Sequence, residues 1–270
     1  MPEASEYTEL FVFQLYPYAS VYLSAEGMLG GEARDRVSGF WRALALTPPA
    51  EADHLALMLA LYARLCELAT SERDPVGRAA WERARKAFLW EHLLSWLHVY
   101  LLKVGELAGP FYRRWSEVLM KALLAEASAL ERAEALPLHL RGETRLVDPR
   151  AGAEVAEFLQ SLLSPARSGM ILARSDLARA ARHLNLGMRL GERAFILRAL
   201  FGQNADAMLQ WLREEACLWA KRHQSYGDSL GEIARAWAEK AEASASLLEE
   251  LRRVATADVQ AAAIKGGRRL

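Results

Sequence analysis

Apolar residues recur at helical spacing along almost the whole chain of 270 residues, and this pattern constrains the fold more than any other feature. Strand-like alternation of apolar and polar residues is nearly absent, and the residues that dominate are Ala, Leu, Arg and Glu, which favour helices. The sequence therefore predicts an all-α fold, in which one large helical bundle carries a C-terminal helical extension.

Prolines and glycines divide this pattern into helices. Pro17 is expected to bend a first helix, Tyr7–Leu23, and a cluster of glycines ends it. Asp74-Pro75 supplies an N-cap followed by proline at the first helical position, which predicts a helix that reaches at least His92. The other predicted helices are residues 32–46, 51–69, 111–136, 153–163, 176–184 with Ser175 as its cap, 192–201, 206–222 and 230–254.

The positions of the prolines and glycines also suggest a division of the chain into regions. Residues 1–136 are predicted to form the core, and residues 137–150, rich in proline, glycine and charge, a linker. Residues 151–255 are predicted to be a helical extension that packs on the core, and residues 256–270 a flexible tail.

Charge and cysteine content exclude several classes of protein. The chain has 34 Lys and Arg against 34 Asp and Glu, so no global basic field attracts nucleic acid or an anionic membrane. Cys66 and Cys217 are isolated, which argues against a disulfide framework or a zinc site. The longest uncharged apolar run, Leu10–Ala25, is interrupted and too short to span a bilayer, so we expect a soluble cytoplasmic protein.

Catalytic signatures are missing from the sequence. It has no phosphate-binding loop, no dinucleotide fingerprint, no His-Glu-x-x-His motif and no nucleophile elbow. The six histidines are scattered, and the spacing of His92 and His98 does not place two ligands on one helix face. These observations predict a binding protein with no metal and no cofactor rather than an enzyme.

Three clusters in the first half of the chain could carry a function. The first is the aromatic segment from Tyr7 to Leu23 with the turn to Glu32, which reads either as a core helix or as a groove for an apolar peptide with carboxylates at its rim. The second, Glu51–Leu55, reads either as an acidic first helical turn or as a His-Asp pair facing a cationic ligand. The third, from Phe88 to Trp115, has the composition of a core helix.

In this order and spacing, the three clusters resemble the TorD/DmsD/NarJ family of chaperones, over about residues 7–130. The pieces that carry the resemblance are Pro17–Leu23 (PYASVYL), Glu26, the turn Gly30-Gly31-Glu32, the motif Glu51-Ala52-Asp53-His54, the segment Phe88, Glu91-His92-Leu93 and Trp96, and Pro110-Phe111-Tyr112. The chain departs from the family pattern at Ala52, where a proline is usual. It also has only six residues before Tyr7, where most members carry a helical hairpin.

The resemblance implies a non-catalytic, cytoplasmic chaperone. Such proteins bind the twin-arginine signal peptide or the N-terminal segment of a molybdopterin-containing oxidoreductase subunit until its cofactor is inserted. The implied peptide-binding residues comprise apolar contacts and a polar end: Tyr18, Tyr22 and Trp96, then Glu26, Asp53 and His54, with His92 orienting the site. The implied partner is that oxidoreductase subunit, with no nucleic acid and no stable membrane insertion, and the protein is a monomer or a homodimer.

Two further interpretations concern the second half. Ser175–Gly187 can be read as half of a helix-turn-helix, so a DNA-binding transcriptional regulator is the alternative function, although the neutral net charge argues against it. Residues 189–222 are similar in pattern to the hairpin that usually opens the family, which predicts a permuted arrangement in which they pack against the aromatic first helix.

Overall fold

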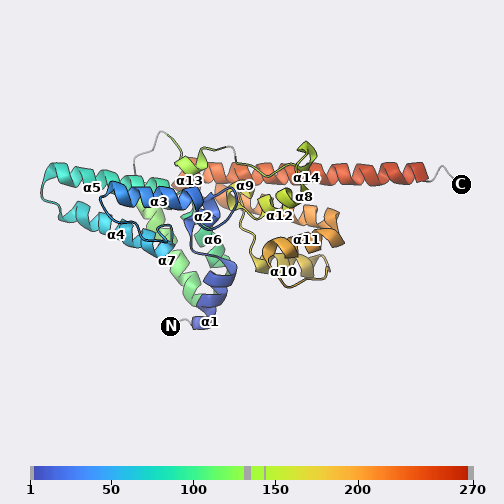
Figure 1. The fold of residues 1–270 in the computed structure, drawn as a ribbon, viewed down its shortest axis with the longest axis horizontal. Helices are drawn as coiled ribbons and strands as arrows, with labels where there is room; N and C mark the ends of the chain where they lie inside the picture. Colours follow the sequence, from blue (N-terminus) through green and yellow to red (C-terminus); the bar gives the residue numbers. More distant parts are fainter. Residues whose placement is uncertain (1–2, 131–134, 143, 267–270) are drawn as a thin grey trace. The chain divides into compact units, whose positions relative to one another are not determined.

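The computed structural model describes residues 3–130, 135–142 and 144–266, and Figure 1 shows helices throughout them. Within these ranges the backbone forms helices and turns, without a strand and with one isolated β-bridge between Tyr18 and His54. The prediction of an all-α fold is therefore confirmed. No helix of the described residues is both long and apolar enough to cross a bilayer.

The chain forms two compact units. The first unit contains residues 1–143 and 225–236, and the second contains residues 144–224 and 237–270. The boundary at 143/144 lies inside the segment 137–150 that the sequence predicts as a linker. The predicted packing of the extension on the core, and the predicted permuted position of residues 189–222, stay predictions.

The first unit is built mainly from paired helices. Its elements are α1 (Ala4–Tyr7), the π-helical turn η1 (Thr8–Gln14), α2 (Ala19–Leu23), α3 (Gly31–Ala43), α4 (Leu55–Ser71), α5 (Pro75–Phe88), the π-helical turn η2 (Leu89–Leu93), α6 (Leu97–Leu107), α7 (Pro110–Ser128), the short 3₁₀ turn η3 (Leu138–Leu140) and α13 (Gly227–Leu230). Helix α4 packs beside α5 and α6 beside α7, and α13 returns to contact α7.

The second unit contains the remaining helices. These are the 3₁₀ turn η4 (Pro149–Ala151), α8 (Val155–Leu162), α9 (Pro165–Ser168), α10 (Arg174–His183), α11 (Arg193–Gln203), α12 (Ala205–Gln224) and most of α14 (Glu232–Gly266). Helix α14 continues past residue 254, where the sequence predicts its end, so the predicted tail from 256 is helical as far as Gly266. Residues 267–270 of that tail lie outside the described residues.

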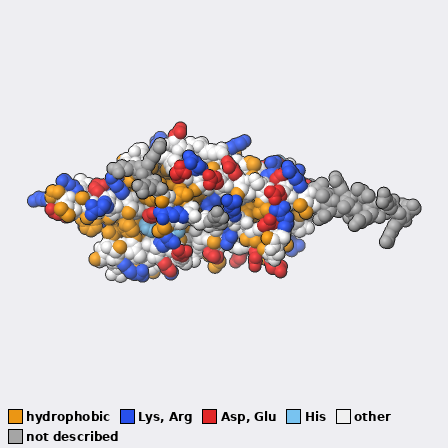
Figure 2. Space-filling view, turned by 90° about the horizontal axis from the view of Figure 1, so that it is seen from above, with side chains coloured by type: hydrophobic (Ala, Val, Ile, Leu, Met, Phe, Trp, Pro, Cys, Tyr) orange, Lys and Arg blue, Asp and Glu red, His pale blue; other side chains and the backbone are white. Residues whose placement is uncertain are grey.

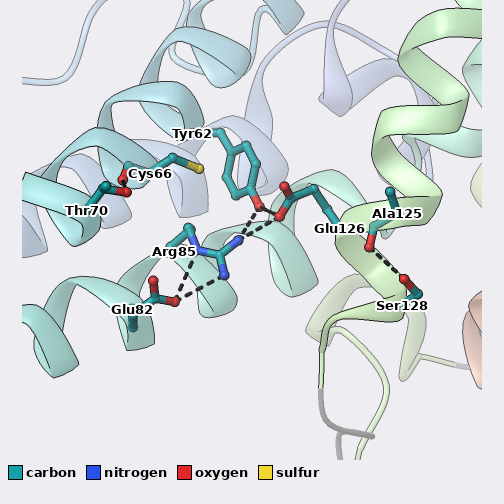
Figure 3. A network of polar contacts seen from close by, with 8 residues as sticks. All are labelled: Tyr62, Cys66, Thr70, Glu82, Arg85, Ala125, Glu126 and Ser128. Atoms are coloured by element: carbon teal, nitrogen blue, oxygen red, sulfur yellow. Dashed lines mark hydrogen bonds and ion pairs between the residues drawn. The ribbon is translucent and has the colours of Figure 1, made fainter.

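A polar network fastens three helices of the first unit to one another (Figure 3). The Tyr62 hydroxyl on α4 donates to Glu126 Oε2 on α7 at 2.7 Å, and Arg85 Nη1 on α5 donates to the same oxygen at 2.6 Å and to the Tyr62 oxygen at 2.9 Å. Burial and the Glu126 carboxylate raise the pKa of Tyr62, so its hydroxyl stays protonated and acts as the donor. The network therefore fixes the spacing of α4, α5 and α7.

The first predicted helix is wrong in one respect, because Pro17 breaks it instead of bending it. The backbone is helical from Ala4 to Gln14, leaves the helix at residues 15–18 and resumes at Ala19. Proline has no amide hydrogen, and it disfavours helical geometry at the residue before it, here Tyr16. The freed Pro17 carbonyl accepts a hydrogen bond from Leu55 N at 2.8 Å, which joins the break to the start of α4.

Two other helix boundaries differ from the prediction for identifiable reasons. The predicted helix 111–136 ends at Ser128, whose hydroxyl donates to the Ala125 carbonyl at 2.7 Å and occupies the acceptor that the next helical turn would use. The predicted cap Ser175 is not the N-cap of α10, because that helix begins two residues earlier, after Ala173. There Asp176 Oδ2 accepts the Ala173 amide at 2.7 Å and completes the turn.

Candidate functional site

The corner at Asp53 joins the Pro17 break to the start of α4. Its carboxylate Oδ2 accepts the Ser20 amide at 3.1 Å and its carbonyl accepts the Ala19 amide at 3.0 Å, so Asp53 caps α2 from a segment 33 residues away. Asp53 is 2% exposed. Because α4 begins only at Leu55, the interpretation of residues 51–53 as its acidic first turn is wrong: they form the corner that holds α2.

His54 and Tyr18 form a half-buried aromatic pair on this corner. The His54 Nδ1 accepts the Ala56 amide at 3.2 Å and thereby caps α4, and the two rings meet edge to face with centroids 4.9 Å apart. Burial and the neighbouring Glu51 carboxylate raise the pKa of Tyr18, so the phenol remains a donor at neutral pH. The pair therefore presents an apolar edge and a hydroxyl beside the exposed Glu51.

Tyr22 and Trp96 lie in the core. Their rings stack with centroids 5.3 Å apart and an interplanar angle of 12°, and Tyr22 is 2% and Trp96 0% exposed. The Tyr22 hydroxyl donates to the Tyr16 carbonyl at 2.9 Å, and Trp96 Nε1 donates to the His92 carbonyl at 2.9 Å. Both side chains thus hold α2 against the segment between η2 and α6, and a ligand would reach them only after a rearrangement of the core.

Glu26 lies on the turn between α2 and α3 and is exposed. The turn is shaped by glycines with positive φ at 27 and 30, a region that glycine reaches without steric cost. It is tied back by the Ser20 hydroxyl, which accepts the Gly30 amide at 3.0 Å. Beside Glu26 on this turn, Met28 is 63% and Leu29 57% exposed, so a carboxylate adjoins apolar surface here.

His92 is packed among aromatic rings, with ring centroids 5.5 Å from Phe40, 5.2 Å from Phe88 and 6.5 Å from His139. It is 8% exposed, and its Nδ1 finds no hydrogen-bond partner in the part of the chain that the structure describes. Burial, together with the charges of His139 and Arg36, lowers the pKa of His92 to about 4. His92 is therefore a neutral core residue at neutral pH.

The structure thus brings Tyr18 into contact with His54, and Tyr22 into contact with Trp96. Asp53 directly precedes His54 in the corner. Two residues that organise the corner were not among the predicted site residues: Ser20, which contacts both Asp53 and the glycine turn, and Glu51. Both lie inside the motifs that carried the resemblance. No group of three or more potential metal ligands gathers in the described residues.

Arg179, one of the basic residues that suggested a DNA-binding helix, is engaged within the second unit. Arg179 pairs with Asp176 at 3.0 Å and with Glu215 at 2.6 Å, and its guanidinium lies over the Trp211 ring. Asp176 itself is buried. Since α10 and α11 are separated by residues 184–192 instead of a tight turn, this region lacks the geometry of a helix-turn-helix.

Comparison with known proteins points to one family. Residues 3–101 match the family model described as nitrate reductase delta subunit. The chain is also 29% identical over 144 residues to a chaperone protein TorD from Shewanella pealeana (strain ATCC 700345 / ANG-SQ1), a match that covers 47% of this chain and 60% of that protein. No solved structure matches the chain significantly. These matches support the resemblance seen in the motifs over the first part of the chain, which is similar to the NarJ/TorD family of maturation chaperones.

Proposed function

We propose that this protein is a cytoplasmic chaperone that binds the twin-arginine signal peptide, or the N-terminal segment, of a molybdopterin-containing oxidoreductase subunit and holds it until cofactor insertion is complete. The match of residues 3–101 to the family model and the similarity to a TorD chaperone support the general class of redox-enzyme maturation chaperone. Because the chain spans 60% of the length of the TorD relative, its activity and partner are part of the proposal.

The observation that carries the proposal is the surface around the Tyr18–His54 pair. An aromatic edge and a phenol hydroxyl lie there beside Glu51. The neighbouring turn adds Glu26 with the exposed Met28 and Leu29. A twin-arginine segment has a cationic end followed by an apolar stretch, and such a ligand needs carboxylates next to apolar surface.

Hydrophobic side chains reach the surface between charged ones over much of the face shown in Figure 2. The predicted contacts divide by accessibility. Tyr18, His54 and Glu26 can meet a peptide directly, whereas Tyr22, Asp53, Trp96 and His92 are buried and would act by keeping the corner in shape.

The proposal is tested by calorimetry with the full chain and synthetic peptides that carry two adjacent arginines and a leucine-rich stretch. We expect Glu26→Gln and Glu51→Gln each to weaken binding about 10- to 100-fold, as the loss of a charge-assisted hydrogen bond does. The matched control is Glu67→Gln, an exposed carboxylate on α4 that pairs with Arg64, which should bind like the wild type. Wild-type affinity of both test variants for every such peptide would refute the site.

A further inference from the structure

The loop between α10 and α11 in the second unit exposes large apolar side chains. Leu190 is 87% and Met188 41% exposed in this loop, and Phe195 in the first turn of α11 is 48% exposed. The Phe195 ring lies against the loop, because a Cβ atom added at Gly191 would be 2.8 Å from its Cδ1. The three apolar side chains come from one short stretch of the chain, and we call them the apolar tip.

The first part of this loop is fixed by hydrogen bonds. Asn185 is left-handed with φ +54°, and the Leu186 amide donates to the Ala181 carbonyl at 2.8 Å, which closes the end of α10. The Gln203 side chain then binds Gly187 twice: its Oε1 accepts the Gly187 amide at 2.7 Å and its Nε2 donates to the Gly187 carbonyl at 2.8 Å. The loop therefore presents the apolar tip without being ordered by a partner.

The loop projects from the second unit and does not line a groove, since residues 187–192 are all exposed. The backbone groups of residues 188–191 find no hydrogen-bond partner in the described part of the chain, so they need water or polar headgroups around them. A peptide partner normally lies in a groove or along a sheet edge. A projecting apolar tip suits a surface that deforms around it, as a bilayer does at the depth of its headgroups.

Three arginines flank the apolar tip along the chain. Arg182 lies in the last turn of α10, Arg189 lies in the loop, and Arg198 lies three residues after Phe195 on α11. All three are exposed, and none forms an ion pair with the described residues. By contrast, the exposed Arg253 on α14 pairs with Glu249 at 3.0 Å. The arginines beside the apolar tip are therefore available to an anionic partner.

The local charge of this stretch differs from that of the whole chain. The chain has as many acidic as basic residues, 34 of each, whereas residues 182–203 contain four arginines and one acidic residue, Glu192. Arginines interleaved with exposed apolar side chains favour an anionic bilayer, where the arginines meet lipid phosphates and the apolar groups leave water. Duplex DNA would bind the arginines but leave the apolar tip in water.

From these observations we propose that the loop between α10 and α11 docks on an anionic lipid bilayer. The apolar tip lies among the headgroups, and Arg182, Arg189 and Arg198 contact the lipid phosphates. This inference goes beyond the proposed function and gives the second unit a role of its own. Docking is peripheral and reversible, because three apolar side chains bury too little area to anchor a protein without the help of charge. It should therefore weaken as the salt concentration rises.

The test measures cosedimentation of the full chain with lipid vesicles and uses no client peptide. Vesicles of phosphatidylcholine and phosphatidylglycerol in equal parts should bind the protein at least tenfold more tightly than vesicles of phosphatidylcholine alone. Arg189→Gln should weaken binding to the mixed vesicles about fivefold, the effect of about 1 kcal/mol for a basic residue at the surface. Leu190→Ser should weaken it about tenfold, because it removes the most exposed apolar side chain of the tip.

Two control variants lie elsewhere in the second unit. Val155→Ser removes another apolar side chain that is 63% exposed, and Arg253→Gln removes another exposed arginine. Both should bind mixed vesicles within twofold of the wild type. Because all four positions are exposed, we expect unchanged unfolding midpoints, and unfolding curves verify that each variant is folded.

Several results would overturn the inference. Equal binding to both kinds of vesicle would show that no anionic lipid is recognised. Equal losses for Leu190→Ser and Val155→Ser, or for Arg189→Gln and Arg253→Gln, would show that this loop is not the docking site. Binding to duplex DNA or to an acidic peptide, without binding to mixed vesicles, would assign the arginines to a different partner and overturn it as well.

Discussion

Each unit of the molecule contains a buried aspartate that caps a helix, and the two are used differently. In the first unit, Asp53 caps α2 from 33 residues away, and its corner leaves the half-buried pair Tyr18–His54 beside exposed carboxylates. In the second unit, Asp176 caps its own helix and is neutralised by Arg179, which also binds Glu215. The capping aspartate of the second unit is therefore paired within that unit, whereas the corner of the first unit leaves carboxylates exposed beside an aromatic pair, and we place the proposed binding function there.

The largest expected effect tests how closely Gly169 packs against helix α14 in the second unit. Gly169 has φ +70°, and a Cβ atom there would lie 2.4 Å from the Ala241 backbone nitrogen. Gly169→Ala should therefore cost about 3–5 kcal/mol of unfolding free energy, because a left-handed alanine and a backbone clash add together. Denaturant unfolding measures this cost.

The matched control is Gly152→Ala in the same unit, where φ is +89° and nothing lies within 4 Å of the added atom. Only the left-handed conformation is penalised there, at about 1–2 kcal/mol. Equal costs for the two substitutions would show that α14 does not approach Gly169 as closely as described.

The next effect compares a buried histidine from each unit. Burial lowers the pKa values of His92 and His223 to about 4, against about 6.5 in an unfolded chain. Between these pH values the unfolded chain binds more protons than the folded one. The free energy of unfolding is therefore highest above pH 6.5 and falls as the pH drops towards 4. At pH 5 each of these histidines should lower the free energy of unfolding by about 2 kcal/mol relative to its value at pH 7.5.

Substitution separates the two histidines. His92→Phe should flatten the pH profile with little loss at pH 7.5, because the ring packs on Phe40 and Phe88 and its Nδ1 has no partner in the described chain. His223→Phe should also lower stability at pH 7.5, since it breaks the contact of His223 Nε2 with the Gly169 carbonyl at 2.8 Å. A pH profile of His92→Phe as steep as that of the wild type would contradict the burial of His92.

A smaller effect concerns the corner itself. Asp53→Ala should cost about 1–3 kcal/mol, because it leaves the buried Ser20 amide without an acceptor. Asp53→Asn keeps an acceptor oxygen and should cost less than half as much. If alanine were tolerated as well as asparagine, the cap on α2 would not be the role of Asp53.

The smallest effect concerns the network that joins α4, α5 and α7. Tyr62→Phe removes the hydroxyl that bridges Arg85 and Glu126 but leaves their ion pair, so it should cost about 1 kcal/mol. Tyr226→Phe is the control, because no hydrogen bond of its half-buried hydroxyl is found among the residues that the structure describes, and it should change the free energy of unfolding by less than about 0.5 kcal/mol. Equal effects would show that the network adds nothing to the first unit.

Local signals made part of this fold predictable. Asp74 caps α5 through a hydrogen bond from the Gly77 amide at 2.8 Å, as the Asp-Pro pair predicts, and helical periodicity was sufficient to identify the fold class. The π-helical turns η1 and η2 were not predicted, because a local change of helical period leaves too few residues to alter the pattern. The corner at residues 51–54 was missed because its partners, Pro17 to Ser20, lie far away in sequence.

The candidate site was predictable to a similar degree. The motifs located Tyr18, His54 and the residues that support them, but spacing alone could not distinguish the buried Asp53 from the exposed Glu26.

The central claim, that the first unit carries the proposed binding function, is tested most directly by hydrogen exchange of the full chain with and without a peptide that carries two adjacent arginines and a leucine-rich stretch. Bound peptide should protect backbone amides around residues 3–30 and 51–56, while the amides of α10 and α11 in the second unit exchange unchanged. Protection confined to α10 and α11, with residues 3–56 unaffected in a saturated complex, would contradict the account.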